Sequence, residues 1–235
     1  MLIGPQNLAR VLGDLRARID RAASAAGRNP AEVTLIAVSK TQSAQSVRDA
    51  ATAGVTDFGE NYVQEALAKI DALDDGRLCW HFIGGVQSNK TRKLAERFAW
   101  IHGIDDLAIA RRLSDQRPFH APPLNLCIQV ALVDEPTKRG VTAAEALELA
   151  PRVAELPRIR LRGLMCVPPP GDVVAVQRAR FAELRRLRDA LNARGLELDT
   201  LSMGMSADFE AAVAEGATLV RIGTALFGPR DLGPR

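Results

Sequence analysis

The chain has 235 residues, a formal net charge of +3 and hydrophobic residues at 47% of its positions. This length suits one α/β barrel or one doubly wound domain over residues 1–235, with a core large enough to fold alone. Basic residues are interspersed with acidic ones and form no stripe, which argues against nucleic-acid binding. No stretch reaches the ~20 apolar residues that span a bilayer and no signal-peptide pattern occurs, so we expect a cytoplasmic protein without membrane association.

The three cysteines indicate no special chemistry. Cys79, Cys127 and Cys166 lie in or beside apolar runs, and no CxxC spacing occurs. An odd number without that spacing indicates neither a disulfide framework nor a zinc site. We therefore expect small core residues and no metal centre.

The hydrophobic pattern predicts helices and strands that alternate from one end of the chain to the other. A leading amphipathic helix covers residues 7–26 and the first strand covers 33–40. The next elements, in chain order, are a helix that Ser43 caps and Gly54 ends, a strand at 56–58, a helix at 63–73, a strand at 79–84, a helix that opens at 86–90, a strand at 100–104, a helix at 107–113, a loop at 116–123 and a strand at 125–132. The last elements are a helix that a Thr142/Glu145 capping box starts, a strand at 160–167, a long helix ending at Gly195, a strand at 198–204, a helix at 207–215, a strand at 218–223 and a short terminal turn. Eight such strands predict a (β/α)8 TIM barrel with an extra N-terminal helix.

In a barrel, the residues that follow the strands share one face, where active sites lie. The first strand is apolar and ends in Lys40, which puts an amine at this mouth. The other polar or conformationally special residues at strand ends are Glu60, Asn61, residues 84–89, Glu135, Lys138, Met165, Ser202, Ser206, Arg221, Gly223 and Thr224.

Two segments near the C-terminus are typical of a phosphate cradle. SMGMS, residues 202–206, places hydroxyls and a glycine before a helix, and RIGT, residues 221–224, adds a second glycine turn with a hydroxyl. Barrels commonly bind phosphate between the loops after strands seven and eight. Each segment alone is better explained by a helix cap or a tight turn, but together on these loops they favour an anion site.

A lysine and a phosphate site at one mouth suggest a Schiff base to a phosphorylated aldehyde. The amine must be neutral to attack, and desolvation beside other cations lowers the pKa of a lysine in that direction. The alternative is an ion pair between Lys40 and a carboxylate such as Glu60.

Five stretches carry a resemblance to a known family: TLIAVSK, FGENYVQEA, WHFIG with QSNK, RGLM, and SMGMSADFEAAVAEGATLVRIGTALFG. From about residue 8 to 228 the chain resembles the pyridoxal phosphate homeostasis proteins, single-domain relatives of the alanine racemase N-terminal barrel. The resemblance implies a fold-type III protein that carries pyridoxal 5′-phosphate (PLP) as an internal aldimine.

The resemblance also implies site residues. Lys40 matches the lysine that forms the aldimine, and Arg221 matches the arginine that faces the pyridine nitrogen, where it makes the ring a weaker electron sink than a carboxylate partner would. Asn61 and Met165 match positions near the ring. The phosphate-holding segments are matched by Ser202, Ser206, Gly223 and Thr224. Lys138 matches a lysine at the mouth, with a solvated loop charge as the alternative, and Val86 replaces the usual leucine of its loop.

The acid/base equipment for catalysis looks incomplete. Racemisation needs two such groups on opposite faces of the substrate, and in alanine racemase the second comes from a tyrosine of another domain. The single tyrosine here, Tyr62, begins a helix and is expected to pack. His81 and His102 lie within strands, which favours hydrogen-bonded core histidines over bases.

The sequence therefore favours a vitamin B6 homeostasis protein that holds and buffers PLP or delivers it to PLP-dependent apoenzymes, with no assigned catalytic residue and no robust turnover. We expect a monomer. The alternatives are a PLP-dependent racemase-like enzyme, a Schiff-base aldolase acting on a sugar phosphate, and an interaction scaffold with a decayed site.

Overall fold

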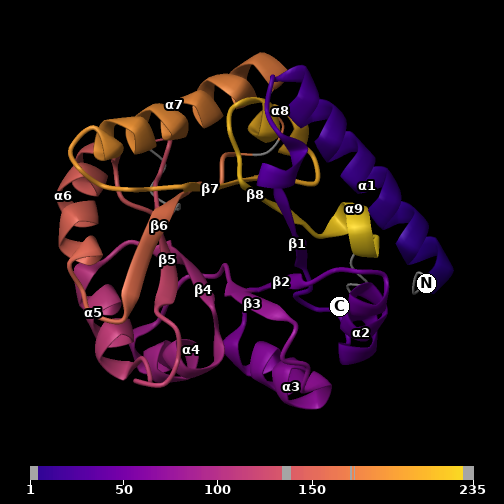
Figure 1. Ribbon diagram of the computed structural model, residues 1–235, viewed down its shortest axis with the longest axis horizontal. Helices are drawn as coiled ribbons and strands as arrows, with labels where there is room; N and C mark the ends of the chain where they lie inside the picture. Colours follow the sequence, from indigo (N-terminus) through magenta and orange to yellow (C-terminus); the bar gives the residue numbers. More distant parts are fainter. Residues whose placement is uncertain (1–4, 134–138, 170, 172, 230–235) are drawn as a thin grey trace.

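Eight parallel strands close into one barrel in the computed structural model, which describes residues 5–133, 139–169, 171 and 173–229. Each strand pairs with the next along the chain, and β8 pairs with β1, so the sheet has no open edge (Figure 1). The strands are β1 (Thr34–Val38), β2 (Asp57–Glu60), β3 (Cys79–Phe82), β4 (Trp100–Ile104), β5 (Leu124–Gln129), β6 (Ile159–Met165), β7 (Thr200–Met205) and β8 (Leu219–Ile222).

Helices surround this barrel on the outside (Figure 1). They are α2 (Ala44–Thr52), α3 (Val63–Leu73), α4 (Thr91–Arg97), α5 (Leu107–Gln116), α6 (Ala143–Ala154), α7 (Val174–Asn192), α8 (Phe209–Ala214) and α9 (Thr224–Phe227). The extra helix α1 (Pro5–Ala25) lies against α8, α9 and α2. A bidentate pair joins α1 to α8, since Arg18 donates to both carboxylate oxygens of Glu210 at 2.9 and 3.0 Å. The (β/α)8 barrel with an N-terminal helix is therefore confirmed.

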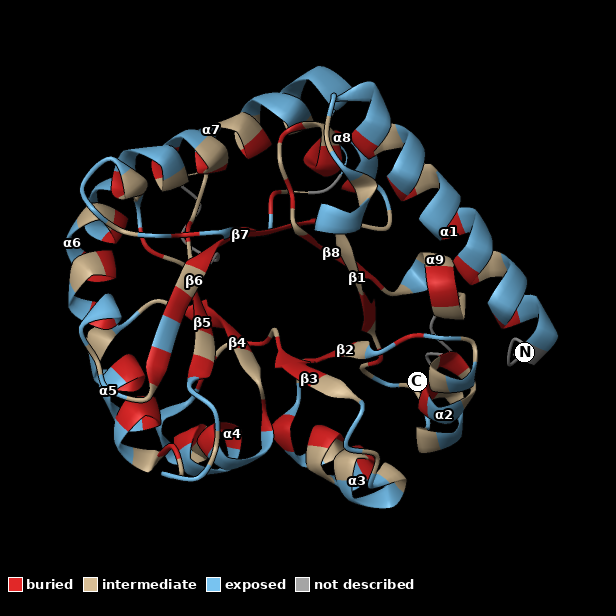
Figure 2. Cartoon of the chain, in the orientation of Figure 1, coloured by how far each residue is buried: buried red, intermediate tan, exposed pale blue. Residues whose placement is uncertain are grey.

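The core comprises the strands and the inward stripe of each helix. Buried residues follow the barrel wall and the inner helix faces, and exposed residues follow the outer faces (Figure 2). Among the largest fully buried side chains are Phe58 from a strand and Phe98 and Phe181 from the helical layer. Close packing of this kind fixes the strand ends to within small displacements, which is what a binding site at the barrel mouth requires.

Most predicted elements lie where the sequence pattern put them, and three differ in an informative way. The first strand ends at Val38, so Lys40 lies two residues beyond it, in a turn. Residues 88–90 form a short 3₁₀ turn before α4 begins at Thr91. The strand predicted to reach residue 132 ends at Gln129, because Val130 turns to form an isolated bridge with Val141.

The capping predictions hold at atomic level. The Ser43 side chain accepts from the backbone N–H of Ser46 at the start of α2, and Thr142 and Glu145 form a complete capping box for α6. Within the described ranges, no helix is both long and apolar enough to cross a membrane.

Candidate functional site

Lys40 lies in a tight turn between β1 and α2. The preceding residue, Ser39, continues the sheet through a hydrogen bond from its N–H to the carbonyl of Gly59 at 3.0 Å, and its own carbonyl accepts from Gln42 N–H at 3.0 Å. Thr41, which follows, has φ +65°, a left-handed conformation that is uncommon for a β-branched residue. Such strain persists only where neighbouring contacts hold the chain in place.

A buried network of charged residues supplies those contacts. The Lys69 amine on α3 donates to the Ser39 carbonyl at 2.6 Å, to Glu60 Oε1 at 2.7 Å and to Glu65 Oε1 at 2.6 Å. Ser39 Oγ donates to the same Glu60 oxygen at 2.6 Å, and Thr41 N–H donates to Glu65 Oε1 at 2.6 Å. The residues on both sides of Lys40 are thus fixed to α3.

Glu60 is fully buried in this network, and its side chain is paired with Lys69. Burial outweighs the attraction of the lysine and raises the pKa of the Glu60 carboxyl above its ordinary value. The Glu60–Lys69 pair was missed at the sequence level. Its only signal was the position of Lys69 in the second turn of the helix that follows Glu60.

The residues expected at the mouth converge on a cavity of about 300 Å³ at the carboxyl ends of the strands, here named the carboxyl-end cavity. Six of the eight predicted site residues line it: Lys40, Asn61, Ser206, Arg221, Gly223 and Thr224. Apolar wall is contributed by Val38, Ile83 and Val167. This volume lies at the small end of the range for pockets that enclose a small molecule.

The two glycine-containing loops meet at one edge of this cavity. Ser206 Oγ accepts from the backbone N–H of Ala225 at 3.2 Å, which joins the loop after β7 to the start of α9. Gly204 has φ +92°, and a Cβ there would lie 2.6 Å from the Cβ of Ala212. Only glycine therefore fits the turn that presents Ser206.

Arg221 lines the cavity from β8, and two hydrogen bonds to buried groups hold its guanidinium in place. NH1 donates to Ser202 Oγ at 2.7 Å and NH2 donates to the Cys166 carbonyl at 2.8 Å. The arginine is almost fully buried, and burial lowers the pKa of its side chain. Ser202 and Met165 are also buried but do not line the cavity. Ser202 lies beneath the arginine as its hydrogen-bond partner.

From Ser202 a chain of hydrogen bonds crosses the barrel interior. His102 Nδ1 lies 2.8 Å from Ser202 Oγ, His102 Nε2 lies 3.0 Å from His81 Nδ1, and His81 Nε2 lies 3.0 Å from Asp57 Oδ1. Burial lowers the pKa of both histidines, that of His102 well below its ordinary value. Both are core histidines satisfied by hydrogen bonds, as the sequence indicated.

Asn61 carries an unsatisfied buried acceptor. Its Oδ1 has no hydrogen-bond partner within the described part of the chain, although the atom is buried and the residue lines the cavity. The backbone here is tightly packed, since a Cβ at Gly84 would lie 2.5 Å from the Asn61 carbonyl oxygen. A buried oxygen without a partner is costly, so this atom is suited to accept from a ligand or a bound water.

Two further sequence expectations concern the mouth. Tyr62 is the N-cap residue of α3, and 58% of its surface is exposed. The packing role predicted for this side chain is therefore wrong. Lys138 lies outside the described residues. Among the described residues that line the cavity, the titratable side chains are Lys40 and Arg221.

Comparison with known proteins shows which family the chain belongs to. The chain matches the family described as alanine racemase, N-terminal domain, over residues 11–231. It is 57% identical over 228 residues to the pyridoxal phosphate homeostasis protein of Pseudomonas aeruginosa, a match that covers 97% of this chain and 96% of that protein. The chain belongs to the pyridoxal phosphate homeostasis protein family. The family protein of Escherichia coli is 51% identical over 231 residues, covering 96% of this chain and 97% of the other.

Solved structures agree with this assignment. The structure of PipY from Synechococcus elongatus with PLP bound has a TM-score of 0.84 and 41% identity, and the match covers 94% of this chain and all of that one. An alanine racemase of Clostridium difficile matches with a TM-score of 0.74 at 14% identity, over 96% of this chain and 57% of that one. At that identity the likeness shows the barrel fold alone.

Proposed function

We propose that the chain is a single PLP-binding barrel domain over residues 1–235, which holds PLP covalently through Lys40 and serves vitamin B6 homeostasis by buffering or delivering it. One observation carries the proposal: the lysine, the hydroxyl and glycine groups of two loops, and a buried arginine line the same cavity. A phosphorylated pyridine aldehyde needs these three kinds of partner.

Each residue has a task that its position suits. Lys40 would provide the amine for the aldehyde carbon, and Ser206, Gly223 and Thr224 would provide hydroxyl and backbone groups for the phosphate. Arg221 would face the pyridine nitrogen and leave it unprotonated, because a guanidinium donates a hydrogen bond but does not transfer its proton at neutral pH. Ser202 orients Arg221 by accepting its hydrogen bond, and Met165 packs in the core next to the cavity without lining it.

The residues present fit such a cofactor. The unpartnered Oδ1 of Asn61, within the described part of the chain, gives a ligand hydroxyl an acceptor at the cavity wall. The network of Lys69, Glu60 and Glu65 keeps the turn around Lys40 in place before any ligand arrives, which reduces the ordering cost of binding. When bound, PLP supplies a reactive aldehyde and an electron-withdrawing ring.

The relatives support the same proposal. Two relatives more than half identical to this chain are named pyridoxal phosphate homeostasis proteins, and the PipY structure contains PLP. We extend PLP binding and the homeostasis role from those proteins to this chain.

We further propose that the protein carries PLP and does not catalyse amino-acid turnover with it. An α-carbon racemase needs a second acid/base group across the substrate from its lysine, and the described lining residues offer only Arg221 besides Lys40. A guanidinium stays protonated at neutral pH and therefore does not serve as a general base. The protein should bind PLP while turning over amino acids little or not at all.

A spectrum tests PLP binding. Purified protein reconstituted with PLP should show the visible absorption of a lysine-bound cofactor, and Lys40→Ala should lose it. Lys93→Ala, on the exposed face of α4, serves as the matched control and should keep it. Wild-type protein that stays colourless with PLP but forms a covalent adduct with a sugar phosphate would replace this proposal with the aldolase interpretation.

A turnover assay tests carriage. With reconstituted protein at catalytic amounts, a panel of L- and D-amino acids should keep its chirality over many hours. Steady racemisation of any member, abolished by Lys40→Ala, would establish the racemase-like enzyme instead.

A further inference from the structure

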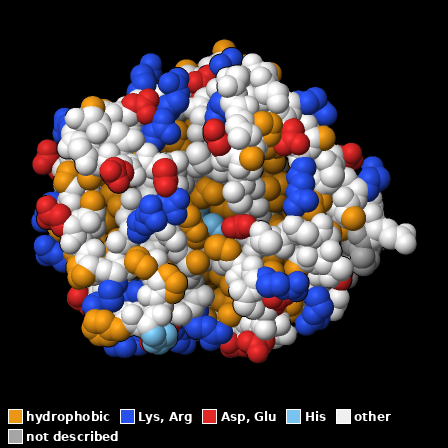
Figure 3. All heavy atoms as spheres, viewed as in Figure 1, with side chains coloured by type: hydrophobic (Ala, Val, Ile, Leu, Met, Phe, Trp, Pro, Cys, Tyr) orange, Lys and Arg blue, Asp and Glu red, His pale blue; other side chains and the backbone are white. Residues whose placement is uncertain are grey.

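The barrel has a second and larger cavity, at the opposite end from the PLP site. Its volume is about 640 Å³, and first residues of several strands line it, among them Thr34, Asp57, Trp100 and Thr200. This amino-end cavity has no task in the proposed function. Figure 3 shows a face that is hollowed near its centre, with histidine and carboxylate atoms visible inside the hollow.

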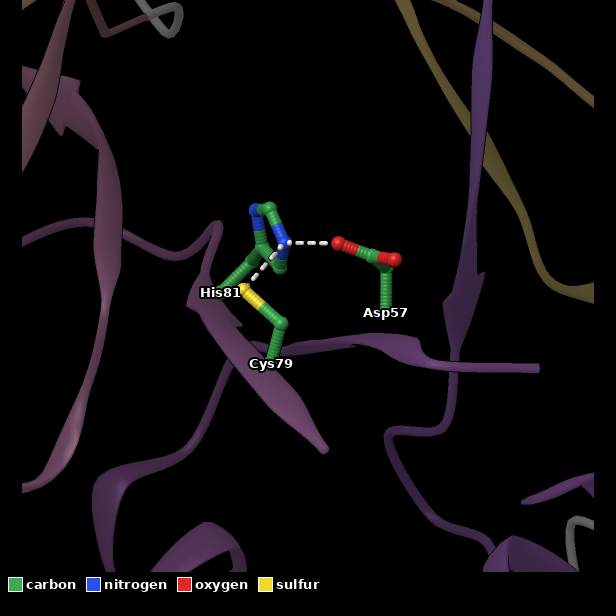
Figure 4. A group of neighbouring side chains, drawn as sticks. All are labelled: Asp57, Cys79 and His81. Atoms are coloured by element: carbon green, nitrogen blue, oxygen red, sulfur yellow. Dashed lines mark hydrogen bonds and ion pairs between the residues drawn. The ribbon is translucent and has the colours of Figure 1, made fainter. Parts of the chain in front are cut away.

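Three metal-ligating side chains meet at this cavity. The ligand atoms of Asp57, Cys79 and His81 all lie within 4.8 Å of one another, and Asp57 and His81 line the cavity. Figure 4 shows the carboxylate from β2 and the thiol and imidazole from β3 pointing toward one another. His81 Nε2 lies 3.0 Å from Asp57 Oδ1 and 3.3 Å from Cys79 Sγ.

The backbone brings these residues together independently of side-chain rotamers. Cys79 and His81 are two residues apart on β3, so their side chains point to the same face of the strand. The register pairs Asp57 directly with Cys79, and Gly59 with His81. The three side chains therefore occupy neighbouring positions on one face of two hydrogen-bonded strands.

The arrangement differs from a nucleophile–base–acid triad. In such a triad the thiol and the carboxylate use different nitrogens of the histidine. Here both contact the same nitrogen, Nε2, while Nδ1 lies 3.0 Å from His102 Nε2. Three donor atoms within 4.8 Å of one another, with the other imidazole nitrogen held by a second hydrogen-bonding group, match the pattern of a metal-binding histidine.

We propose that Asp57, Cys79 and His81 bind one Zn²⁺ ion at the amino ends of β2 and β3, with a fourth coordination position open to the amino-end cavity. One sulfur, one nitrogen and one oxygen ligand form a set that zinc accepts. Tetrahedral zinc with ordinary bond lengths separates such ligand atoms by about 3.3–3.6 Å. The 3.0 and 3.3 Å separations from His81 Nε2 need to widen by a few tenths of an ångström, and the third separation, between Asp57 and Cys79, lies within 4.8 Å, so a shift of one side chain brings all three to zinc distances.

The surroundings orient the histidine and leave the Asp57 charge available to a cation. The His81 ring stacks on Trp100 with 5.5 Å between ring centroids and 14° between planes. Two arginines of the cavity are paired with other carboxylates, Arg162 with Asp199 and Arg185 with Glu215. Asp57 accepts instead from Thr56 at 2.6 Å and lies 3.0 Å from His81, and neither of these partners carries a permanent positive charge.

Proton balance is simple for this site. Zinc takes the lone pair of His81 Nε2, and the neutral ring then carries its proton on Nδ1, from which it donates to His102 Nε2. Cys79 binds as the thiolate and its proton leaves to solvent. The cation replaces the hydrogen bonds that now hold the three side chains together.

Metal titration of the PLP-loaded protein, after dialysis against a chelator, tests the proposal. Zn²⁺ binding is measured by competition with a chromophoric chelator, and Co²⁺ is used as a spectroscopic substitute that shows a thiolate charge-transfer band. Wild-type protein should bind one ion per chain and show the band. Cys79→Ser should remove the band and weaken Zn²⁺ binding by about 100-fold, and Asp57→Asn should weaken it at least ~10-fold.

A matched control and a folding check keep the test decisive. Cys127→Ser changes a buried cysteine of β5 and should bind both ions like the wild type. Circular dichroism and retained PLP absorption establish that each variant is folded. The proposal is overturned if the cobalt band persists in Cys79→Ser, if wild type and Cys79→Ser bind Zn²⁺ equally, or if wild type binds no ion and the three side chains form only a hydrogen-bonded cluster.

Discussion

The Lys69 amine lies 2.6 Å from the carbonyl oxygen of Ser39, the residue immediately before Lys40. One lysine thus fixes the backbone from which another reaches the cavity. Because Lys69 also contacts Glu60 at 2.7 Å and both side chains are buried, its loss should affect stability and PLP binding together.

Lys69→Met should destabilise the fold by about 3–5 kcal/mol, because it leaves the buried Glu60 carboxylate without its counter-charge. The released turn should also bind PLP less tightly. Urea unfolding and a PLP titration measure the two effects. Lys93→Met, on an exposed position of α4, is the control and should change both by little. Equal behaviour of the two variants would show that the network does not hold the turn.

Glu60→Gln should change how stability depends on pH. Burial raises the pKa of Glu60 in the folded protein above the ordinary value of 4.5, so the folded state holds its proton to higher pH than the unfolded chain does. The stabilisation this provides is complete below about 4.5 and is lost as pH rises through the folded pKa. The unfolding free energy of wild type minus that of Glu60→Gln should therefore fall as pH rises above about 4.5. A difference that rises over this range would mean that Lys69 pairing outweighs burial.

Alanine substitutions at the two serines of the SMGMS segment should have different effects, one mainly on stability and the other mainly on PLP affinity. Ser202→Ala removes an acceptor from the buried Arg221 guanidinium and should cost about 1.5–3 kcal/mol of stability. Ser206→Ala changes a half-buried hydroxyl that lines the cavity, and should raise the PLP dissociation constant about tenfold with a smaller loss of stability. Paired denaturation and PLP titrations measure both. If Ser202→Ala instead gave the larger loss of PLP affinity at unchanged stability, Ser202 would contact the phosphate directly.

Two glycines with nearly the same backbone angle test the packing of the Ser206 turn. Gly195 has φ +94° and no heavy atom within 4 Å of the place a Cβ would take, so Gly195→Ala should cost roughly 1–2 kcal/mol from backbone strain. Gly204 has φ +92°, and its Cβ would clash with Ala212, so Gly204→Ala should cost about 1–3 kcal/mol more. Thermal or urea unfolding compares them. Equal losses would mean that the turn relaxes away from α8 without cost.

The barrel and much of its mouth could be predicted from the sequence because both depend on local patterns. Alternating apolar runs fix the strands, and the residues just after them, such as Lys40 and Thr224, follow at the mouth. Side-chain contacts between different elements leave no such pattern. The Lys69–Glu60 pair joins a helix to a strand, and the depth of Ser202 depends on which face of β7 turns inward.

The cluster of Asp57, Cys79 and His81 illustrates the same limit. Sequence rules for zinc sites rely on short CxxC-type spacings, and here the ligands come from two strands with the helix α3 between them along the chain. Only the register of β2 against β3 brings Asp57 opposite Cys79. The exposure of Tyr62 was mispredicted for a related reason: its place at a helix start does not reveal which side of the helix the ring takes.

The central claim is that Lys40 bonds to PLP, and reductive trapping tests it most directly. Borohydride treatment of the PLP-loaded protein fixes the lysine–cofactor bond, and peptide mass spectrometry then locates the added mass. We expect one modified peptide, with the pyridoxyl group on Lys40. Modification of Lys69, Lys90 or Lys93 in place of Lys40, or no modification at all, would contradict the account.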